Sequence, residues 1–228
     1  MELKGRLKLI SNKIPICNIL CDIGTDHAYI PIFLVKDKRC KRAVACDIRM
    51  KPLVAARRNI RAYGLEEHID TRLGDGLEPL GENEADVIII AGVGGNMIER
   101  ILKNGFKKAL NADSLVLQPM NDIDMVRRWL YQNGFDIYDE GLIDEGEKIY
   151  NVICTRWTGE AKELDPVYYY IGRKLVENRD PLLERYLSKK IRQLEKIIID
   201  MENVEEEHKE KRRGYMDLLD GFKRLREI

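Results

Sequence analysis

The stretch Asp22-Ile23-Gly24-Thr25-Asp26-His27-Ala28 decides the fold of this 228-residue chain, because it joins an apolar run to a helical one through a glycine turn. Residues 18–22 before the turn have the apolar centre of a buried strand, and residues 28–36 after it are typical of a helix. Gly24 allows the backbone to turn tightly between the two. A strand, a glycine turn and a helix in this order form the first unit of a doubly wound α/β sheet.

The same alternation continues outward from this unit to residue 157. Strands are predicted at residues 18–22, 42–47, 69–73, 86–91, 114–117, 135–144 and 148–157, and helices at 2–13, 28–36, 50–63, 96–103 and 122–133. Strands that alternate with helices form a parallel sheet with helices on both faces. The last two strands follow each other through Gly146, which predicts an antiparallel hairpin at the sheet edge. The fold class is therefore α/β, with a seven-stranded, mostly parallel sheet.

The pattern changes after Gly159, because the strand signal stops there. Residues 166–228 are predicted to be helical throughout, with two segments of apolar residues at helical spacing on either side of a charged stretch at 205–213. This pattern indicates an antiparallel α-helical hairpin of coiled-coil character. We expect two domains, a ligand-binding domain at residues 1–160 and a helical coiled-coil domain at 161–228.

The charges cancel in total but are divided into blocks. Lys plus Arg and Asp plus Glu both number 39, which excludes a protein that holds nucleic acid through bulk positive charge. Residues 36–61 nevertheless contain ten basic and two acidic residues, whereas residues 62–99 contain nine acidic residues and only Arg72 as a base. If the fold places the basic block beside a pocket, the protein can orient an anionic substrate.

Other compositional features predict a cytoplasmic protein without a membrane span. The longest apolar runs fall far short of the roughly 20 residues that cross a bilayer as a helix. The N-terminal residues are charged and lack the apolar core of a signal peptide. The five cysteines form no Cys-x-x-Cys pair, so we expect reduced, buried thiols and no metal. We expect a monomer.

Four predicted turns, each at the carboxyl end of a strand, carry the unusual residues. Ligands of open α/β sheets bind at this edge. The first turn contains Gly24, and the second strand ends in Asp47, whose carboxylate can accept hydrogen bonds from ribose hydroxyls. The third strand is followed by Gly74-Asp75-Gly76, where the carboxylate can bind an exocyclic amine. The fourth ends in Ala91-Gly92-Val93-Gly94-Gly95, where glycines open space. Together the turns predict a cofactor that contains adenosine.

The first turn favours S-adenosyl-L-methionine over a dinucleotide. A dinucleotide site needs Gly-x-Gly-x-x-Gly facing the pyrophosphate, but Asp26 occupies the second glycine position and would repel it. An aspartate suits a ligand that carries an amino group and a sulfonium cation. The predicted antiparallel strand at the end of the sheet also marks the methyltransferase version of this fold.

These motifs, together with Leu117-Gln118-Pro119-Met120 and the helical C-terminal region, resemble the TrmK family of bacterial tRNA (adenine-22, N1)-methyltransferases over the whole chain. The family usually has Met at the position of Val93. The resemblance implies a Rossmann-like class I methyltransferase fold that binds S-adenosyl-L-methionine and acts on tRNA. The expected cofactor-binding residues are Asp22, Gly24, Thr25, Asp26, His27, Asp47, Ile48, Gly74, Asp75, Gly76, Ala91, Gly92 and Val93.

The chemistry needs little from the protein, because adenine N1 already carries a lone pair. Positioning of N1 in line with the methyl group accounts for most of the expected rate. Asp26 is the first catalytic candidate, as an acceptor that stabilises the cationic base or takes a proton from N6. Equally, Asp26 can bind only the cofactor's amino group. His27 is a candidate proton carrier and Tyr29 a candidate stacking partner, although both residue types also fit purely structural roles.

Basic residues outside the turns are the candidates for tRNA contact. We expect phosphate binding by Lys4, Arg6, Arg39, Arg42, Arg57, Arg58 and Arg61. A solvated helix face is the alternative interpretation of the basic block. Three rival functions stay open: a methyltransferase for another RNA or a small molecule, a non-catalytic RNA-binding module on the same scaffold, and a nicotinamide-dependent dehydrogenase.

Overall fold

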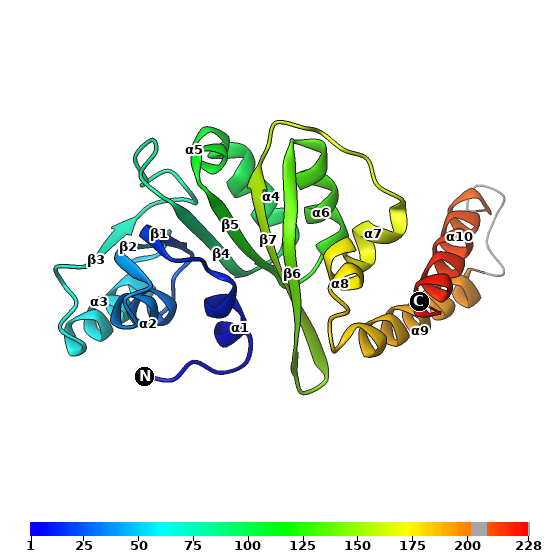
Figure 1. The fold of residues 1–228 in the computed structure, drawn as a ribbon, viewed down its shortest axis with the longest axis horizontal. Coiled ribbons are helices and arrows are strands. Elements are labelled where there is room, and N and C mark those ends of the chain that lie inside the picture. The colour runs from blue at the N-terminus through cyan, green and yellow to red at the C-terminus, as the bar shows by residue number, and fades with distance from the viewer. Residues whose placement is uncertain (202–208, 228) are drawn as a thin grey trace.

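The computed structural model describes residues 1–201 and 209–227, which form a layered α/β body with a helical extension at one end (Figure 1). Residues 205–208 of the predicted charged stretch, and residue 228 at the end of the predicted helical region, lie outside the described residues. The seven strands are β1 Cys17–Ile23, β2 Cys40–Asp47, β3 Ile69–Leu73, β4 Val87–Val93, β5 Ser114–Pro119, β6 Phe135–Glu145 and β7 Lys148–Trp157.

The strands form one sheet in the order β3-β2-β1-β4-β5-β7-β6. The first five strands are mutually parallel, and β7 pairs antiparallel with both β5 and β6. The sheet therefore confirms the predicted seven-stranded, mostly parallel architecture. Because β1 pairs with both β2 and β4, the chain reverses its direction of travel across the sheet at β1, and a crevice opens there at the carboxyl ends.

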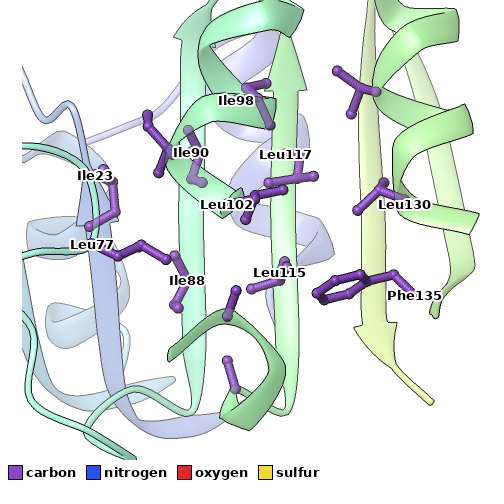
Figure 2. Packing of buried hydrophobic residues seen from close by; sticks show 14 of the residues in the cluster. Ile23, Leu77, Ile88, Ile90, Ile98, Leu102, Leu115, Leu117, Leu130 and Phe135 are labelled. Carbon is purple, nitrogen blue, oxygen red and sulfur yellow. The ribbon is translucent and has the colours of Figure 1, made fainter. Parts of the chain in front are cut away.

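Helices cover both faces of the sheet because the central strands are apolar on both sides. Ile88 and Ile90 of β4 pack on one face and Ile89 on the other, as the two-residue period of a strand requires. The helices of the first face are α4 Gly95–Asn104, α5 Phe106–Asn111 and α6 Ile123–Gln132. Those of the second are α1 Gly5–Lys13, α2 Tyr29–Lys36 and α3 Met50–Ala62. Figure 2 shows Ile88 and Ile90 beside Ile98 and Leu102 of α4.

The C-terminal region contains α7 Pro166–Ile171, α8 Arg173–Glu177, α9 Leu183–Asp200 and α10 Lys209–Arg226. Helices α9 and α10 pack against each other at the end of the molecule beyond β6 (Figure 1). The prediction that this region is helical throughout is wrong at Gly172 and at residues 178–182. Gly172 ends α7 with φ 93°, and a Cβ there would lie 2.6 Å from Glu140 Oε2, so only glycine fits this close approach.

Helix α5 and strand β4 also differ from the predicted elements. Helix α5 was not predicted, because six residues are too few to show a helical period. Strand β4 extends two residues beyond Ala91 and includes Gly92, which the sequence pattern assigned to the turn. Among the described residues, no helix is long and apolar enough to span a membrane.

A buried ion pair ties the C-terminal helices to the sheet. The guanidinium of Arg127 on α6 is fully buried, and its Nε donates to Glu140 Oε1 of β6 at 2.7 Å. Its other nitrogens donate to the Asn151 side chain and to the backbone carbonyls of Tyr169 and Tyr170. The second Glu140 oxygen accepts from the Lys174 backbone at 3.2 Å. This network satisfies both charges and fixes α7 and α8 on the sheet edge.

Loss of Arg127 would leave the Glu140 carboxylate buried without its cation. We therefore expect Arg127→Met to lower the free energy of unfolding by about 3–5 kcal/mol, as measured by urea denaturation. Arg173→Met is the matched control, because exposed Arg173 pairs with Glu177 on the same helix and such pairs contribute under about 1 kcal/mol. Equal losses in the two variants would contradict the role given to the buried pair.

Candidate functional site

A pocket of about 660 Å³ lies at the carboxyl ends of the parallel strands. Its walls come from the turns after β1, β2, β3 and β4, from the end of β5, and from α1, which contributes Arg6, Leu7 and Ile10. Pockets of this size hold small molecules and cofactors in other proteins. The pocket therefore occupies the edge at which the sequence placed a ligand.

The turn after β1 is held by two backbone hydrogen bonds to the neighbouring strand. The N–H groups of Gly24 and Thr25 both donate to the carbonyl of Cys46, at 2.9 and 2.8 Å. Gly24 has φ 78°, and a Cβ built on it would meet no atom within 4 Å. The glycine thus leaves free space along the pocket wall at a backbone conformation that other residues rarely adopt.

Gly92 forms a matching open wall at the end of β4. The β4–β5 register shifts between Ala91 and Val93, so Gly92 is the extra residue of a β-bulge. Its φ is 76°, and a Cβ there would also meet no atom within 4 Å. The buried side chain of Gln118 on β5 accepts a hydrogen bond from the Gly92 N–H at 3.2 Å and donates to the Pro119 carbonyl at 2.9 Å. Gln118 therefore holds the bulge in place.

Two buried carboxylates stand side by side in the pocket. Asp22 on β1 is 8% exposed and Asp47 on β2 is 6% exposed. Burial raises the pKa of Asp22 to about 6, with a smaller contribution from the charge of Asp47, while a hydrogen bond with Thr25 opposes the rise. Asp47 accepts a hydrogen bond from the Arg49 N–H at 2.7 Å. A cationic ligand would relieve the repulsion between these two groups.

The rim of the pocket carries the three catalytic candidates together. Asp26 Oδ2 lies 3.2 Å from His27 Nε2, and the Asp26 side chain is 75% exposed. The His27 ring stacks on the Tyr29 ring with 5.0 Å between centroids. His27 Nδ1 is buried, and no described residue hydrogen-bonds it. The geometry leaves the Asp26 carboxylate accessible to a substrate at the pocket mouth.

The structure brings all of the expected cofactor-binding residues to this one pocket. Asp75, after β3, lies there with one carboxylate oxygen 3.5 Å from Arg100 Nη2. The sequence assigned no role in the site to Gln118, Arg49, Met97 and Arg100, which also line the pocket, although Gln118 belongs to the motif at 117–120. Gln118 could have been found by applying the carboxyl-end rule to the fifth strand, whereas Arg49 and Arg100 carry no sequence signal beyond their charge.

The expected tRNA-binding residues are not gathered at the pocket, and Arg6 alone among them lines it. Arg39 and Arg42 lie at the start of β2, on the opposite edge of the sheet, a strand length of roughly 25 Å away. The Arg39 guanidinium donates to the Ile14 carbonyl. Helix α3 carries Arg57, Arg58 and Arg61, and Lys4 immediately precedes α1. The basic block at 36–61 thus extends from the pocket wall, where Arg49 lies, to the opposite edge of the sheet.

No group of three His, Cys, Asp or Glu side chains in the described part of the chain is arranged to hold a metal ion. The polar lining of the pocket consists of carboxylates, arginines, one histidine, one tyrosine, one threonine, one glutamine and backbone groups. Such a lining can bind a ligand that carries hydroxyl, amino and carboxylate groups.

The chain is similar to known methyltransferases in sequence. A family model described as a methyltransferase domain matches residues 3–153. The tRNA (adenine(22)-N(1))-methyltransferase of Bacillus subtilis is 37% identical over 168 residues, which are 74% of this chain and 69% of that relative.

Solved structures agree with this similarity over nearly the whole chain. The crystal structure of the B. subtilis m1A22 tRNA methyltransferase TrmK superimposes with a TM-score of 0.89 at 29% identity, covering 99% of both chains. A Streptococcus pneumoniae protein in complex with S-adenosyl-L-methionine has a TM-score of 0.84 at 32% identity and covers 97% of this chain and 98% of its own. TrmK of M. capricolum, in complex with S-adenosylhomocysteine, has a TM-score of 0.80 at 28% identity, covering 100% of this chain and 97% of its own.

The burial of Asp22 predicts a gain in stability when its charge is removed. We expect Asp22→Asn to raise the melting temperature of the ligand-free protein at pH 7.5, by about 2–4 °C for each kcal/mol of repulsion and desolvation relieved. The folded-state pKa of about 6 lies above the ordinary value of 3.8. Above pH 6 the Asp22 carboxylate is ionised in the folded protein, and its destabilising effect has its full size. The effect decreases as the pH falls toward 3.8.

Differential scanning calorimetry at pH 7.5 and pH 5 tests this expectation, and the difference from wild type should shrink at pH 5. Asp75→Asn is the control, because the Asp75 side chain is 45% exposed and should change the melting temperature little. An equal rise at both pH values would show that the charge of Asp22 is not its cause.

Proposed function

This chain belongs to the TrmK family of tRNA (adenine(22)-N(1))-methyltransferases, and we propose that it transfers a methyl group from S-adenosyl-L-methionine to N1 of the adenine at position 22 of tRNA. The observation that carries the proposal is the pocket itself. It runs across the carboxyl ends of five parallel strands and combines two glycine walls with two buried carboxylates. The similarity of the whole chain to TrmK structures supports the tRNA substrate.

The pocket fits S-adenosyl-L-methionine, whose chemical contribution is an electrophilic methyl group on a sulfonium. The open space beside Gly24 and Gly92 allows a ligand to approach the backbone closely. Asp47 can accept hydrogen bonds from the ribose hydroxyls, and Asp75 can accept one from the adenine amino group. Asp22 offers a buried negative charge to the cationic end.

The role of the protein in the reaction is chiefly to position the target base. Adenine N1 uses its own lone pair, so the chain must hold the base in line and exclude water. The Asp26 carboxylate at the rim can accept a hydrogen bond from the adenine N6 amino group and stabilise the positive charge that develops. Tyr29, stacked on His27, can border the base, and His27 can carry a proton.

The target adenine must leave its stack to enter this pocket, which costs a few kcal/mol that phosphate contacts elsewhere must offset. We assign these contacts to Lys4, Arg39, Arg42, Arg57, Arg58 and Arg61, with Arg6 at the pocket itself. Arg42, Arg57, Arg58 and Arg61 are exposed, as phosphate contact requires.

Residues 1–160 form the S-adenosyl-L-methionine-binding domain, and residues 161–228 form the helical coiled-coil domain. The protein acts in the cytoplasm, where tRNA is the substrate. It acts as a monomer and without a metal ion, because the displacement needs neither a metal-activated nucleophile nor a residue from a second chain.

Methyl transfer to tRNA transcribed in vitro tests the function directly. The purified chain is incubated with S-adenosyl-L-methionine labelled in the methyl group, and the product nucleosides are separated. We expect 1-methyladenosine in a transcript with adenine at position 22 and none in a transcript with guanine there. Label in both transcripts would contradict the position, and label only in small molecules would contradict the substrate class.

Asp47 is expected to matter for cofactor affinity because its carboxylate is buried at the ribose end of the site. Asp47→Ala should raise the dissociation constant for S-adenosyl-L-methionine by roughly tenfold or more in isothermal titration calorimetry, since a charge-assisted hydrogen bond is lost. Asp37→Ala is the control, because Asp37 is exposed after α2 and lies outside the pocket. Unchanged affinity of the Asp47 variant would place the ribose elsewhere.

A further inference from the structure

Two cysteines lie side by side at the amino ends of β1 and β2, at the edge of the sheet opposite the pocket. Cys17 is the first residue of β1 and Cys40 is the first residue of β2, and the two are direct partners in the parallel register. Neighbouring strands lie about 4.7–4.9 Å apart. Both side chains pack on the face of the sheet that α1, α2 and α3 cover. The two thiols therefore project side by side from one face.

Cys17 connects this pair of thiols to solvent. It is partly exposed, whereas the other four cysteines of the chain, Cys21, Cys40, Cys46 and Cys154, are buried. Because Cys40 lies directly beside Cys17 in the register, a reagent hardly larger than water can enter the pair from the Cys17 side. The pair thus combines one accessible sulfur with one buried sulfur.

The two sulfurs also interact with each other. The Cys17 thiol donates a hydrogen bond to Cys40, and this bond lowers the pKa of Cys40 and raises the pKa of Cys17. When it is protonated, Cys40 donates in turn to the carbonyl of Arg42, with 2.6 Å between Sγ and the oxygen. The thiolate is the reactive form of a cysteine. Cys40 is therefore the member of the pair that ionises first, in contact with the thiol of Cys17.

A second pair of cysteines on the same two strands lacks this geometry. Cys21 is the register partner of Val44, so Cys46 is displaced from it by two residues, and both cysteines pack on the other face of the sheet. The rise along a strand and the spacing between strands put their Cα atoms roughly 8 Å apart. Two cysteines whose Cα atoms are more than about 7 Å apart cannot be bridged without backbone movement. Only Cys17 and Cys40 meet this condition on β1 and β2.

We propose that Cys17 and Cys40 form a site of reversible covalent modification, at which a hydroperoxide oxidises the two thiols to a disulfide. The Cα spacing of paired strands lies inside the roughly 4.4–6.8 Å that disulfides span. The bond draws the two Cβ atoms to about 3.5–4.5 Å, which is closer than the spacing of the strands, and strain of this kind makes a disulfide easier to reduce. Thiol reductants therefore restore the dithiol. This inference does not depend on methyl transfer.

The oxidation consumes one molecule of hydrogen peroxide in two steps. The Cys40 thiolate attacks one peroxide oxygen, so an S–O bond forms, the O–O bond breaks, and the departing hydroxide takes up the proton that Cys40 released. Cys17 then attacks the sulfur of this sulfenic acid. The S–S bond forms, the S–O bond breaks, and the proton of Cys17 leaves with the oxygen as water. Both sulfurs are oxidised, and the two peroxide oxygens are reduced to two waters.

Disulfide mapping of the wild-type chain tests this proposal without an assay of activity. The reduced, folded protein is treated with hydrogen peroxide, the peroxide is removed with catalase, and the remaining thiols are blocked with N-ethylmaleimide during denaturation. We expect two of the five free thiols to be lost and to be recovered with dithiothreitol. Mass spectrometry of a non-reducing digest should find one pair of peptides, joined through Cys17 and Cys40.

Cys154→Ser is the matched control, because Cys154 is buried in β7 and its loss should leave the link unchanged. Cys17→Ser should form no intrachain disulfide. No loss of thiols in the wild type, a link between Cys21 and Cys46 in similar yield, or a link between two chains would overturn the proposal. Oxygen added to Cys40 without a link would also overturn it. The wild-type map decides the pairing even if Cys17→Ser does not fold.

Discussion

The hydrogen-bonded register of the five parallel strands is the constraint on which the rest of this structure depends. In a parallel sheet every strand ends at the same edge, so the residues after β1, β2, β3 and β4 meet although they are far apart in sequence. The register also links the turns. The Cys46 carbonyl at the end of β2 accepts from both Gly24 and Thr25, and Gln118 on β5 holds the bulged Gly92 of β4. The turns that form the site are thus held in place by hydrogen bonds to the neighbouring strands of the sheet.

The buried carboxylates of the site destabilise the folded protein but favour the binding of a cationic ligand. Asp22 and Asp47 are both buried at neighbouring strand ends, and burial with mutual repulsion raises the pKa of Asp22 to about 6. A chain selected for stability alone would avoid this arrangement, because burying a charge without a partner is costly. A cationic ligand would relieve the repulsion between the two carboxylates, so the site favours the binding of such a ligand. A cofactor with an ammonium group and a sulfonium fits this preference.

The turn between β6 and β7 connects the pocket wall with the C-terminal helices. Glu145, at the end of β6, accepts from the Arg6 backbone, and the neighbouring Asp144 pairs with Arg185 of α9. Lys189 of α9 donates to the Glu147 carbonyl at 2.7 Å. Helices α7 and α8 are attached separately through the buried Arg127–Glu140 pair. The helical region is therefore fixed to the sheet both at this turn and at the buried pair, and the turn also supports α1.

The sequence by itself determined the sheet, its helices and the residues of the ligand site, because apolar periodicity and glycine turns are local signals that the carboxyl-end rule converts into a shared location. Gly24, Asp47, Asp75 and Gly92 were found in this way. What only the tertiary structure decided depends on contacts between distant segments. Examples are the insertion of β7 between β5 and β6, the bulge held by Gln118, and the position of Arg6 beside Met120 and Tyr150. A run of charged residues in a sequence does not show where those residues lie in the fold. The basic block at 36–61 could therefore be counted from the sequence, but its position relative to the pocket followed only from the positions of β2 and α3.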